Sequence, residues 1–180
     1  ALEVDVTQRE EVEEAVETCL KTMGHVDILV NNVGWDRIEP FIENTPDFWE
    51  KVIAINLKSA IYCTRAVLDS MIERRKGKII NISSTTADTG LYQIIHYACS
   101  KGAVVTLTRC LARALGRHNI NVNCICPGYT IDEATLLALG GKEDAADRSL
   151  QSRAIRRREY PQDLVGTAIY LASADSDFVT

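Results

Sequence analysis

Short apolar runs alternate with longer amphipathic stretches along almost the whole chain. Four short runs have the length and residue types of β-strands, and three of them are apolar enough to be buried on both faces. These runs lie at 2–6, 27–31, 78–83 and 121–126. The longer stretches carry apolar residues with helical spacing and lie at 8–23, 45–75 and 97–117, with a further helix opened by Pro161. Alternation of this kind predicts an α/β fold in which helices cover a parallel sheet.

Local residues mark where the first two helices begin and end. Thr7 and Glu10 have the spacing of a capping box at the start of the first helix. Gly24 and Gly77 are expected to end the first and the second helix. The charge-rich segment 129–160 is long for a connection, and we expect it to act as a lid over a ligand.

The composition is that of one globular domain spanning residues 1–180. Hydrophobic residues make up 46% of the chain and charged residues 25%, which excludes a disordered protein. The net charge of −5 argues against a nucleic-acid partner. No apolar stretch reaches the ~18 residues that a membrane span needs, and the first residues lack the basic segment of a signal peptide. We therefore expect a cytoplasmic protein without membrane contact.

The six cysteines are expected to be buried, reduced thiols. Four fall in helical stretches, two alternate along the last strand, and none forms a C-x-x-C pair. They are Cys19, Cys63, Cys99, Cys110, Cys124 and Cys126. The three histidines are scattered without the spacing of metal ligands, so no metal site is predicted.

Polar or turn residues follow each predicted strand. In chain order they are Asp5, Asn31-Asn32-Val33-Gly34, Ser83-Ser84 and Pro127-Gly128. In open parallel sheets, ligands bind at the carboxyl ends of the strands. One such cluster would merely end a strand, whereas four in succession indicate a ligand site along this edge of the sheet.

Tyr97 and Lys101 stand four residues apart on a predicted helix, so both side chains lie on one face. A neighbouring ammonium lowers the pKa of a phenol, which suits proton exchange with a carbonyl or alcohol oxygen. Taken alone, the pair is more typical of an ordinary surface helix. Ser84, at the end of a strand, can face the same pocket. Asn56 is a polar residue inside an apolar helical stretch and needs a hydrogen-bond partner.

Together these motifs resemble the short-chain dehydrogenase/reductase family in order and spacing. The motifs are Asn31-Asn32-Val33-Gly34, Asn56, Ile82-Ser83-Ser84, Tyr97-Ala98-Cys99-Ser100-Lys101 and Cys126-Pro127-Gly128. The match extends from Asp5 to Leu164, nearly the whole chain. The resemblance implies a Rossmann-like doubly wound parallel sheet with helices on both faces, and NAD or NADP as the cofactor.

The resemblance also implies a catalytic tetrad. Tyr97 would be the acid/base, and Ser84 would hold the substrate oxygen. Lys101 would lower the pKa of Tyr97 and bind the nicotinamide ribose. Asn56 would anchor a water molecule that leads protons to Lys101.

Further residues would border the cofactor by the same resemblance. Asp5 and Val6 would lie at the adenine, Asn31 and Gly34 along the cleft, and Pro127 and Gly128 against the nicotinamide. The family commonly places a threonine four residues after the glycine of this last motif, but Asp132 stands there. Thr130 is the candidate to take its place.

The sequence has no glycine-rich turn of the G-x-G-x-x-G kind, which in the family seats the cofactor pyrophosphate. Aligned by its motifs, the chain starts in the family's third strand and stops before the seventh, so we expect an incomplete sheet. The strand at 2–6 would then stay unpaired or would pair directly with 27–31. We expect such a chain to bind a dinucleotide poorly. The residues that choose between NAD and NADP are not among those present.

Residues beside the motifs are expected to shape a substrate pocket. Trp35 and Tyr92 are placed to wall it, while His96 is expected to be a loop residue. A cluster of positive charge is either a solvated or inter-subunit ion-pairing face, or a clamp for a phosphate-bearing substrate such as an acyl-CoA. It consists of Arg153, Arg156, Arg157 and Arg158.

The sequence therefore predicts an NAD(P)-dependent oxidoreductase that interconverts a secondary alcohol and a ketone. Trp35-Asp36 looks similar to dehydrogenases of cyclic hydroxyacyl-CoA, and 3-oxoacyl reductases are the neighbouring possibility. The competing class is a truncated remnant that holds no cofactor and keeps only assembly contacts. A homodimer or homotetramer is expected, because in the family two of the helices build subunit contacts. Their apolar faces here comprise Val52, Ile55, Ser59, Tyr62, Val104, Val105, Leu111 and Leu115.

Overall fold

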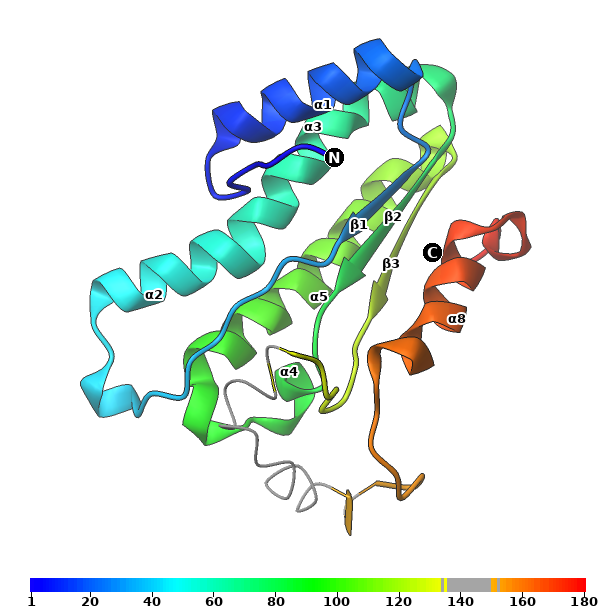
Figure 1. Ribbon diagram of the computed structural model, residues 1–180. Coiled ribbons are helices and arrows are strands. Elements are labelled where there is room, and N and C mark those ends of the chain that lie inside the picture. The colour runs from blue at the N-terminus through cyan, green and yellow to red at the C-terminus, as the bar shows by residue number, and fades with distance from the viewer. Residues whose placement is uncertain (134, 136–149, 152) are drawn as a thin grey trace.

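A computed structural model describes residues 1–133, 135, 150–151 and 153–180. Its centre is a sheet of three parallel strands in the order β1-β2-β3 (Figure 1). The strands are β1 (Ile28–Asn31), β2 (Gly77–Ile82) and β3 (Ile120–Ile125). In the register of this sheet, Asn31 lies opposite Asn81, and Asn81 lies opposite Cys124. The predicted α/β fold with a parallel sheet is confirmed.

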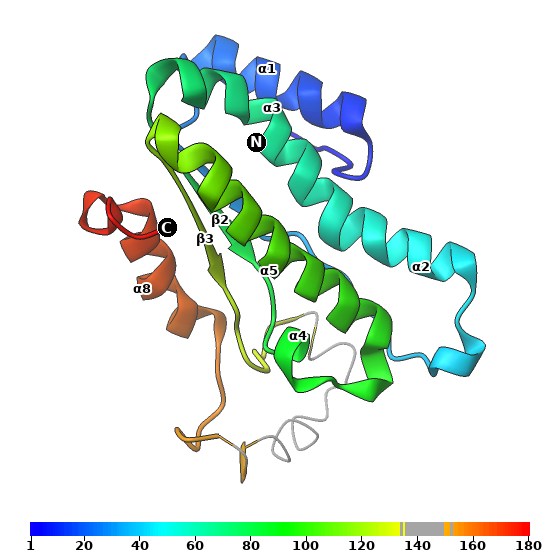
Figure 2. The same cartoon turned by 180° about the vertical axis from the view of Figure 1, so that it is seen from behind.

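Helices cover both faces of the sheet. The longer ones are α1 (Arg9–Met23), α2 (Pro46–Ile53), α3 (Ser59–Arg74), α5 (Ile95–Leu115) and α8 (Pro161–Ala172). Shorter elements are the helix α4 (Thr86–Thr89), a π-helical turn (Ala54–Lys58) and 3-10 turns at Phe41–Glu43, Tyr92–Ile94, Gly116–His118 and Ala174–Ser176. The helices α3 and α5 lie on one face with α1 outside α3, and α8 lies on the other face (Figures 1 and 2).

Alternate side chains of β2 build the two halves of the core. Ile79 is fully buried against Val67 and Met71 of α3, together with Val122 of β3. Ile80 faces the opposite way and packs on α8 in a second cluster. Burial on both faces explains why this strand is an uninterrupted apolar run in the sequence.

The chain before α1 differs from its prediction. Residues 2–6 form no strand, so of the two expected outcomes the unpaired one is found. The predicted capping box is also wrong, because the Thr7 hydroxyl donates instead to Asp5 Oδ1 at 2.7 Å, and α1 begins after Gln8. Among the described residues no strand pairs with the edge of β1 that faces away from β2, and Ile28 and Val30 are 43% and 47% exposed.

The second predicted helix begins as expected but is interrupted. Thr45 caps α2 by accepting a hydrogen bond from the Phe48 amide at 3.2 Å, and Pro46 occupies the first position. The π-helical turn separates α2 from α3, and Arg75 rather than Gly77 ends α3, in a left-handed conformation with φ of 51°. Gly77 instead opens β2, where a Cβ would lie 2.5 Å from the Met71 sulfur.

Two predictions about side-chain exposure are wrong. None of the six unpaired cysteines is buried, and Cys99, Cys110 and Cys126 are exposed. Of the apolar residues assigned to subunit contacts, Val52 and Val104 lie inside the core with 0% and 2% exposure. Helical spacing alone does not distinguish a face that packs on a neighbouring helix from one that packs on another subunit.

Candidate active site

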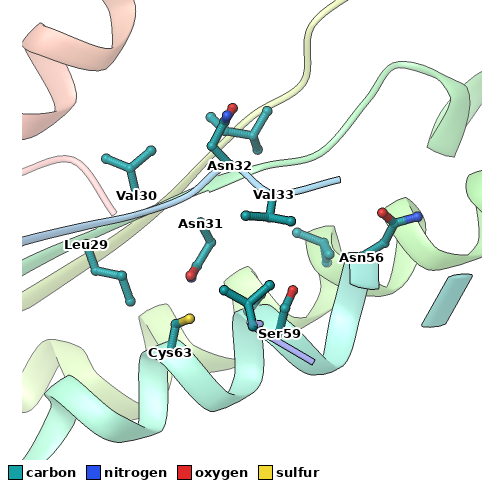
Figure 3. A pocket seen from close by; sticks show the side chains of 12 residues that line it. Leu29, Val30, Asn31, Asn32, Val33, Asn56, Ser59 and Cys63 are labelled. Atoms are coloured by element: carbon teal, nitrogen blue, oxygen red, sulfur yellow. The ribbon is translucent and has the colours of Figure 1, made fainter. Parts of the chain in front are cut away.

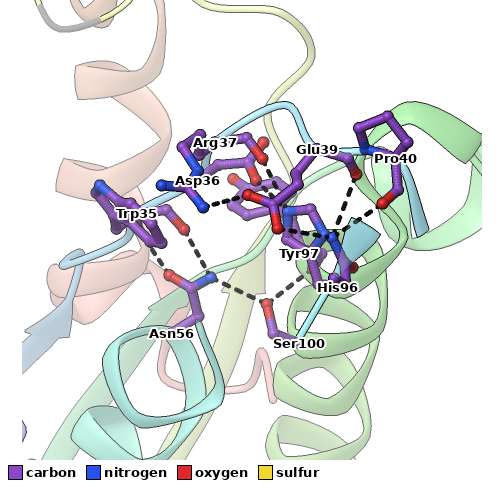
Figure 4. Close-up of polar contacts among 10 residues, drawn as sticks. Trp35, Asp36, Arg37, Glu39, Pro40, Asn56, His96, Tyr97 and Ser100 are labelled. Atoms are coloured by element: carbon purple, nitrogen blue, oxygen red, sulfur yellow. Dashed lines mark hydrogen bonds and ion pairs between the residues drawn. The ribbon is translucent and has the colours of Figure 1, made fainter. Parts of the chain in front are cut away.

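Four predicted site residues come together beyond the carboxyl ends of β1 and β2, and Figure 4 shows two of them, Asn56 and Tyr97. Asn56 lies in the π-helical turn, and Ser84 follows β2 by two residues. Tyr97 and Lys101 occupy the first two turns of α5, one turn apart as their spacing predicts. The fold therefore places three separate segments around one spot.

Asn56 holds the loop after β1 by its backbone. Its Oδ1 accepts from the Trp35 amide at 2.7 Å, and its Nδ2 donates to the Trp35 carbonyl at 2.9 Å. The same Nδ2 donates to Ser100 Oγ at 3.0 Å, which links the loop to α5. These three bonds satisfy the side-chain amide of Asn56, as a buried asparagine inside a helix requires. The π-helical turn directs this side chain inward, and such turns are frequent at functional sites.

Lys101 is buried, with 2% exposure. Its Nζ donates to the Ile82 carbonyl at 2.9 Å, at the very end of β2. The Ser83 hydroxyl donates to the Lys101 carbonyl at 2.7 Å, so strand and helix are fixed to each other twice. Burial lowers the pKa of Lys101, while the nearby Cys124 raises it.

The Tyr97 phenol lies near the Ser84 hydroxyl. Burial raises the pKa of Tyr97, the negative charge of Asp36 raises it further, and the Ser84 hydroxyl opposes both. This direction is opposite to the expected lowering by Lys101. The geometry explains it, because the Lys101 ammonium lies 5.6 Å from the centre of the Tyr97 ring and Asp36 adds a negative charge.

Gly34 passes directly over the buried ammonium. A Cβ at this position would lie 3.1 Å from Lys101 Nζ and 3.6 Å from Asn56 Oδ1. The glycine of the Asn-Asn-Val-Gly motif is thus explained by close approach, and its φ is not positive.

We expect Gly34→Ala to lower kcat/KM by about tenfold, because the added methyl group displaces the Lys101 ammonium or the turn above it. The fold should survive, with a melting temperature within a few degrees of the original. Gly116→Ala is the matched control, since nothing lies within 4 Å of its Cβ position. Unchanged steady-state kinetics for Gly34→Ala would contradict this reading of the close approach.

The residues expected along the cofactor cleft are partly engaged elsewhere. Asn31 donates to Asn81 Oδ1 at 2.8 Å and to Thr64 Oγ1 at 3.2 Å, so its amide nitrogen binds core side chains. Asp5 accepts from the Thr7 amide and hydroxyl, and these bonds lower the pKa of its carboxyl. Val6 and Asn31 line a cavity of about 120 Å³ between β1 and α3 (Figure 3).

The segment after β3 folds back on the loop that carries Ser84. The Pro127 carbonyl accepts from the Thr85 amide at 3.0 Å, which brings this motif beside the site. A Cβ on Gly128 would lie 3.1 Å from a carboxylate oxygen of Glu159. Thr130 donates its hydroxyl to the same carboxylate at 2.7 Å.

The expected substrate-pocket residues have different surroundings. The Trp35 ring packs edge-on against Phe48 with centroids 5.9 Å apart, and the Lys51 ammonium lies 4.3 Å from its centre. Tyr92 is 75% exposed. Arg157 binds both carboxylate oxygens of Asp163, at 2.7 and 2.6 Å, so it forms an ion pair within the chain. Half of the predicted lid, residues 134, 136–149 and 152, lies outside the described residues.

The contact between Asp36 and His96 was not predicted from the sequence. His96, expected in a loop, is the second residue of α5 and has 0% exposure. Its Nε2 lies 2.9 Å from Asp36 Oδ1 and 3.1 Å from the Arg37 carbonyl. The position of His96 next to Tyr97 was the signal that could have indicated a role.

Two observations fit a nicotinamide cofactor beside Lys101. An ammonium has three N–H donors, and its one acceptor in the described part of the chain is the Ile82 carbonyl. Gly34 leaves a cradle above it that a Cβ would fill. Spare donors under an open backbone turn suit the hydroxyl groups of a ribose. Within the described ranges, no group of three or more His, Cys, Asp or Glu side chains could hold a metal ion. No described helix is long and apolar enough to cross a membrane.

Comparison with known proteins identifies the family. The family model of short chain dehydrogenases matches residues 1–136. The chain is 42% identical over 175 residues to 5-keto-D-gluconate 5-reductase of Escherichia coli K12, covering 97% of this chain and 68% of the relative. It is 32% identical over 177 residues to the 3-oxoacyl-[acyl-carrier-protein] reductase of Thermotoga maritima, covering 98% and 71%.

A solved structure shows the same fold. The gluconate 5-dehydrogenase of Burkholderia cenocepacia J2315, in complex with NADP and tartrate, superposes with a TM-score of 0.92 at 36% identity. The match covers 98% of this chain and 69% of that one. The Rossmann-like fold expected from the motifs is thereby confirmed. The chain belongs to the short chain dehydrogenase family.

Proposed function

We propose that this protein is an NAD(P)-dependent oxidoreductase that interconverts a secondary alcohol and a ketone, with Tyr97 as the acid/base. The observation that carries the proposal is the grouping of Tyr97, Ser84 and Lys101, in which the partly buried phenol lies near the buried Ser84 hydroxyl and 5.6 Å, at its ring centre, from the buried Lys101 ammonium. Proton exchange with a carbonyl oxygen needs a donor and a second hydroxyl at one position.

We propose sugar acids or polyols as the substrate class. Support comes from the 5-keto-D-gluconate reductase and the gluconate dehydrogenase to which the chain is similar. The 3-oxoacyl reductase is a more distant relative, at 32% identity. A thioester clamp gains no support from Arg157, because both of its terminal nitrogens already bind Asp163.

The chain's own residues would divide the work as follows. A bound NAD(P)H supplies the hydride. Lys101 would bind the cofactor ribose through its two remaining donors, with Gly34 leaving room above it. Ser84 would orient the substrate carbonyl, and Tyr97 would donate its proton to the oxygen. Asn56 would keep the loop at Trp35 against α5, so that the site stays closed to bulk water on that side.

The test is the oxidation of NADPH and of NADH by the intact protein with 5-keto-D-gluconate, a neutral ketose and acetoacetyl-CoA. We expect turnover of the first two ketones above that of the thioester, and loss of turnover with Tyr97→Phe. Absence of activity on every ketone, or full activity in Tyr97→Phe, would overturn the proposal.

A further inference from the structure

A half-buried carboxylate and a buried imidazole lie beside Tyr97 without a part in the proton transfer described above. Asp36 follows Trp35, whose backbone Asn56 clamps at both polar atoms. His96 precedes Tyr97 on α5, and its Nε2 meets Asp36 Oδ1 at 2.9 Å. Figure 4 shows both side chains between the loop and the helix that carry the candidate site. The carboxylate is therefore fixed from two directions.

The contacts of His96 define its tautomer. Its Nε2 faces two acceptors, Asp36 Oδ1 and the Arg37 carbonyl at 3.1 Å, so this nitrogen carries a proton and donates. Its Nδ1 is buried with no partner in the described part of the chain. Phe48 and Trp49 enclose the ring, with centroids 4.7 and 6.2 Å away. His96 is thus a donor through Nε2, held rigidly in an aromatic cage.

The carboxylate keeps capacity for another hydrogen bond. The Asp36 side chain is 26% exposed, whereas that of His96 is 0% exposed, so the open side of the pair is the carboxylate. A carboxylate offers about four acceptor sites. The neighbouring cation Arg37 pairs with Glu39 and lies over the Phe48 ring, 4.7 Å from its centre. The partner of Asp36, His96, directly precedes Tyr97 on α5, which brings the carboxylate to the side of the phenol, and the negative charge of Asp36 raises the pKa of Tyr97.

We propose that Asp36 is a specificity-determining residue that accepts a hydrogen bond from a substrate hydroxyl next to the reacting carbonyl, and that His96 is a positioning residue for it. This inference rests on the proposed function. A half-buried carboxylate is incompletely solvated and keeps acceptor sites beyond those facing His96 and the Arg37 amide, so a hydroxyl on the substrate improves its hydrogen bonding. A substrate with a methylene in place of the hydroxyl gives Asp36 no hydrogen bond. A substrate carboxylate at the same position is repelled by the negative charge of Asp36. The site thus selects ketones with a hydroxyl on the adjacent carbon and directs the acidic end of a sugar acid away from Asp36.

A matched pair of ketones tests the proposal in the intact protein. Hydroxyacetone and 2-butanone have the same number of heavy atoms and differ in a hydroxyl against a methyl group. We expect kcat/KM to favour hydroxyacetone, and Asp36→Ala to reduce that preference by about 10- to 100-fold, the size expected for a hydrogen bond to a charged group. Asp47→Ala, which removes an exposed carboxylate of α2, is the control and should leave the ratio unchanged.

Two substitutions of His96 separate positioning from folding. His96→Gln retains an N–H donor and should keep most of the preference for hydroxyacetone. His96→Phe fills the aromatic cage without a donor and should raise KM for hydroxyacetone while changing kcat for 2-butanone little. Equal losses on both ketones in Asp36→Ala, or an unchanged ratio, would overturn the inference alone. If the unsubstituted protein reduces neither of these ketones nor 5-keto-D-gluconate, the proposed function fails and this inference fails with it.

Discussion

Tyr97→Phe is expected to lower kcat for ketone reduction by a factor of about 10² to 10⁴, the range of a lost general acid. The ring stays in place, since α5 holds it and the substitution removes only the hydroxyl near Ser84. Binding of NADPH, measured by fluorescence titration, should change little. The measurement is the steady-state rate at saturating ketone.

The pH dependence of the same reaction follows from the direction in which the pKa of Tyr97 is shifted. Burial and Asp36 raise the pKa of Tyr97, so the phenol keeps its proton at neutral pH and can act as an acid for reduction. Oxidation of the alcohol requires the phenolate, and its rate should rise as the pH increases toward that raised pKa. Tyr170→Phe, at a 44% exposed position of α8, is the control. A Tyr97→Phe enzyme that retains its rate would exclude this phenol as the acid.

Asn56→Ala should destabilise the protein by about 2–3 kcal/mol, because three hydrogen bonds are lost and both polar atoms of the Trp35 backbone lose their partner. The expected loss of activity is larger than that of stability, since the loop over Lys101 is released. Denaturant unfolding measures the first effect and kcat/KM the second.

Asn56→Asp provides a sharper version of this experiment. A carboxylate can accept from the Trp35 amide but cannot donate to the Trp35 carbonyl or to Ser100. A protonated carboxyl regains one donor, so the stability of this variant relative to the original should increase as the pH falls. Asn32→Ala, at an exposed position in the adjacent turn, is the control for stability. A loss in Asn56→Ala no greater than in Asn32→Ala would show that the clamp contributes little.

The parallel sheet and the spacing of the site were predictable because they depend on local patterns. A strand buried on both faces must be apolar throughout, as β2 is, and a one-turn separation must bring Tyr97 and Lys101 to one side of α5. The glycine at position 34 could be identified by motif, but its cause, the buried ammonium beneath it, is a tertiary contact.

Other features could not be predicted, for physical reasons. The Thr7 hydroxyl has two possible partners of similar energy, a backbone amide in the first turn of α1 and the carboxylate of Asp5. The sequence alone does not determine which of the two bonds forms. The Asp36–His96 pair joins residues 60 positions apart, so no local pattern reveals it. The pKa of Tyr97 is raised by burial and by the carboxylate of Asp36, which is distant in the sequence.

The π-helical turn at Ala54–Lys58 has a consequence for the length of the chain at this point. A π-helical turn holds one residue more than a regular α-helical turn, so deleting one residue here should let α2 and α3 join as one unbroken α-helix. Asn56 lies inside this turn, and its bonds to Trp35 and Ser100 depend on the direction that the turn gives to its side chain. The extra residue is therefore expected to matter as much as the identity of Asn56 itself, and a deletion here should be far less tolerated than substitutions of Ile53 or Leu57.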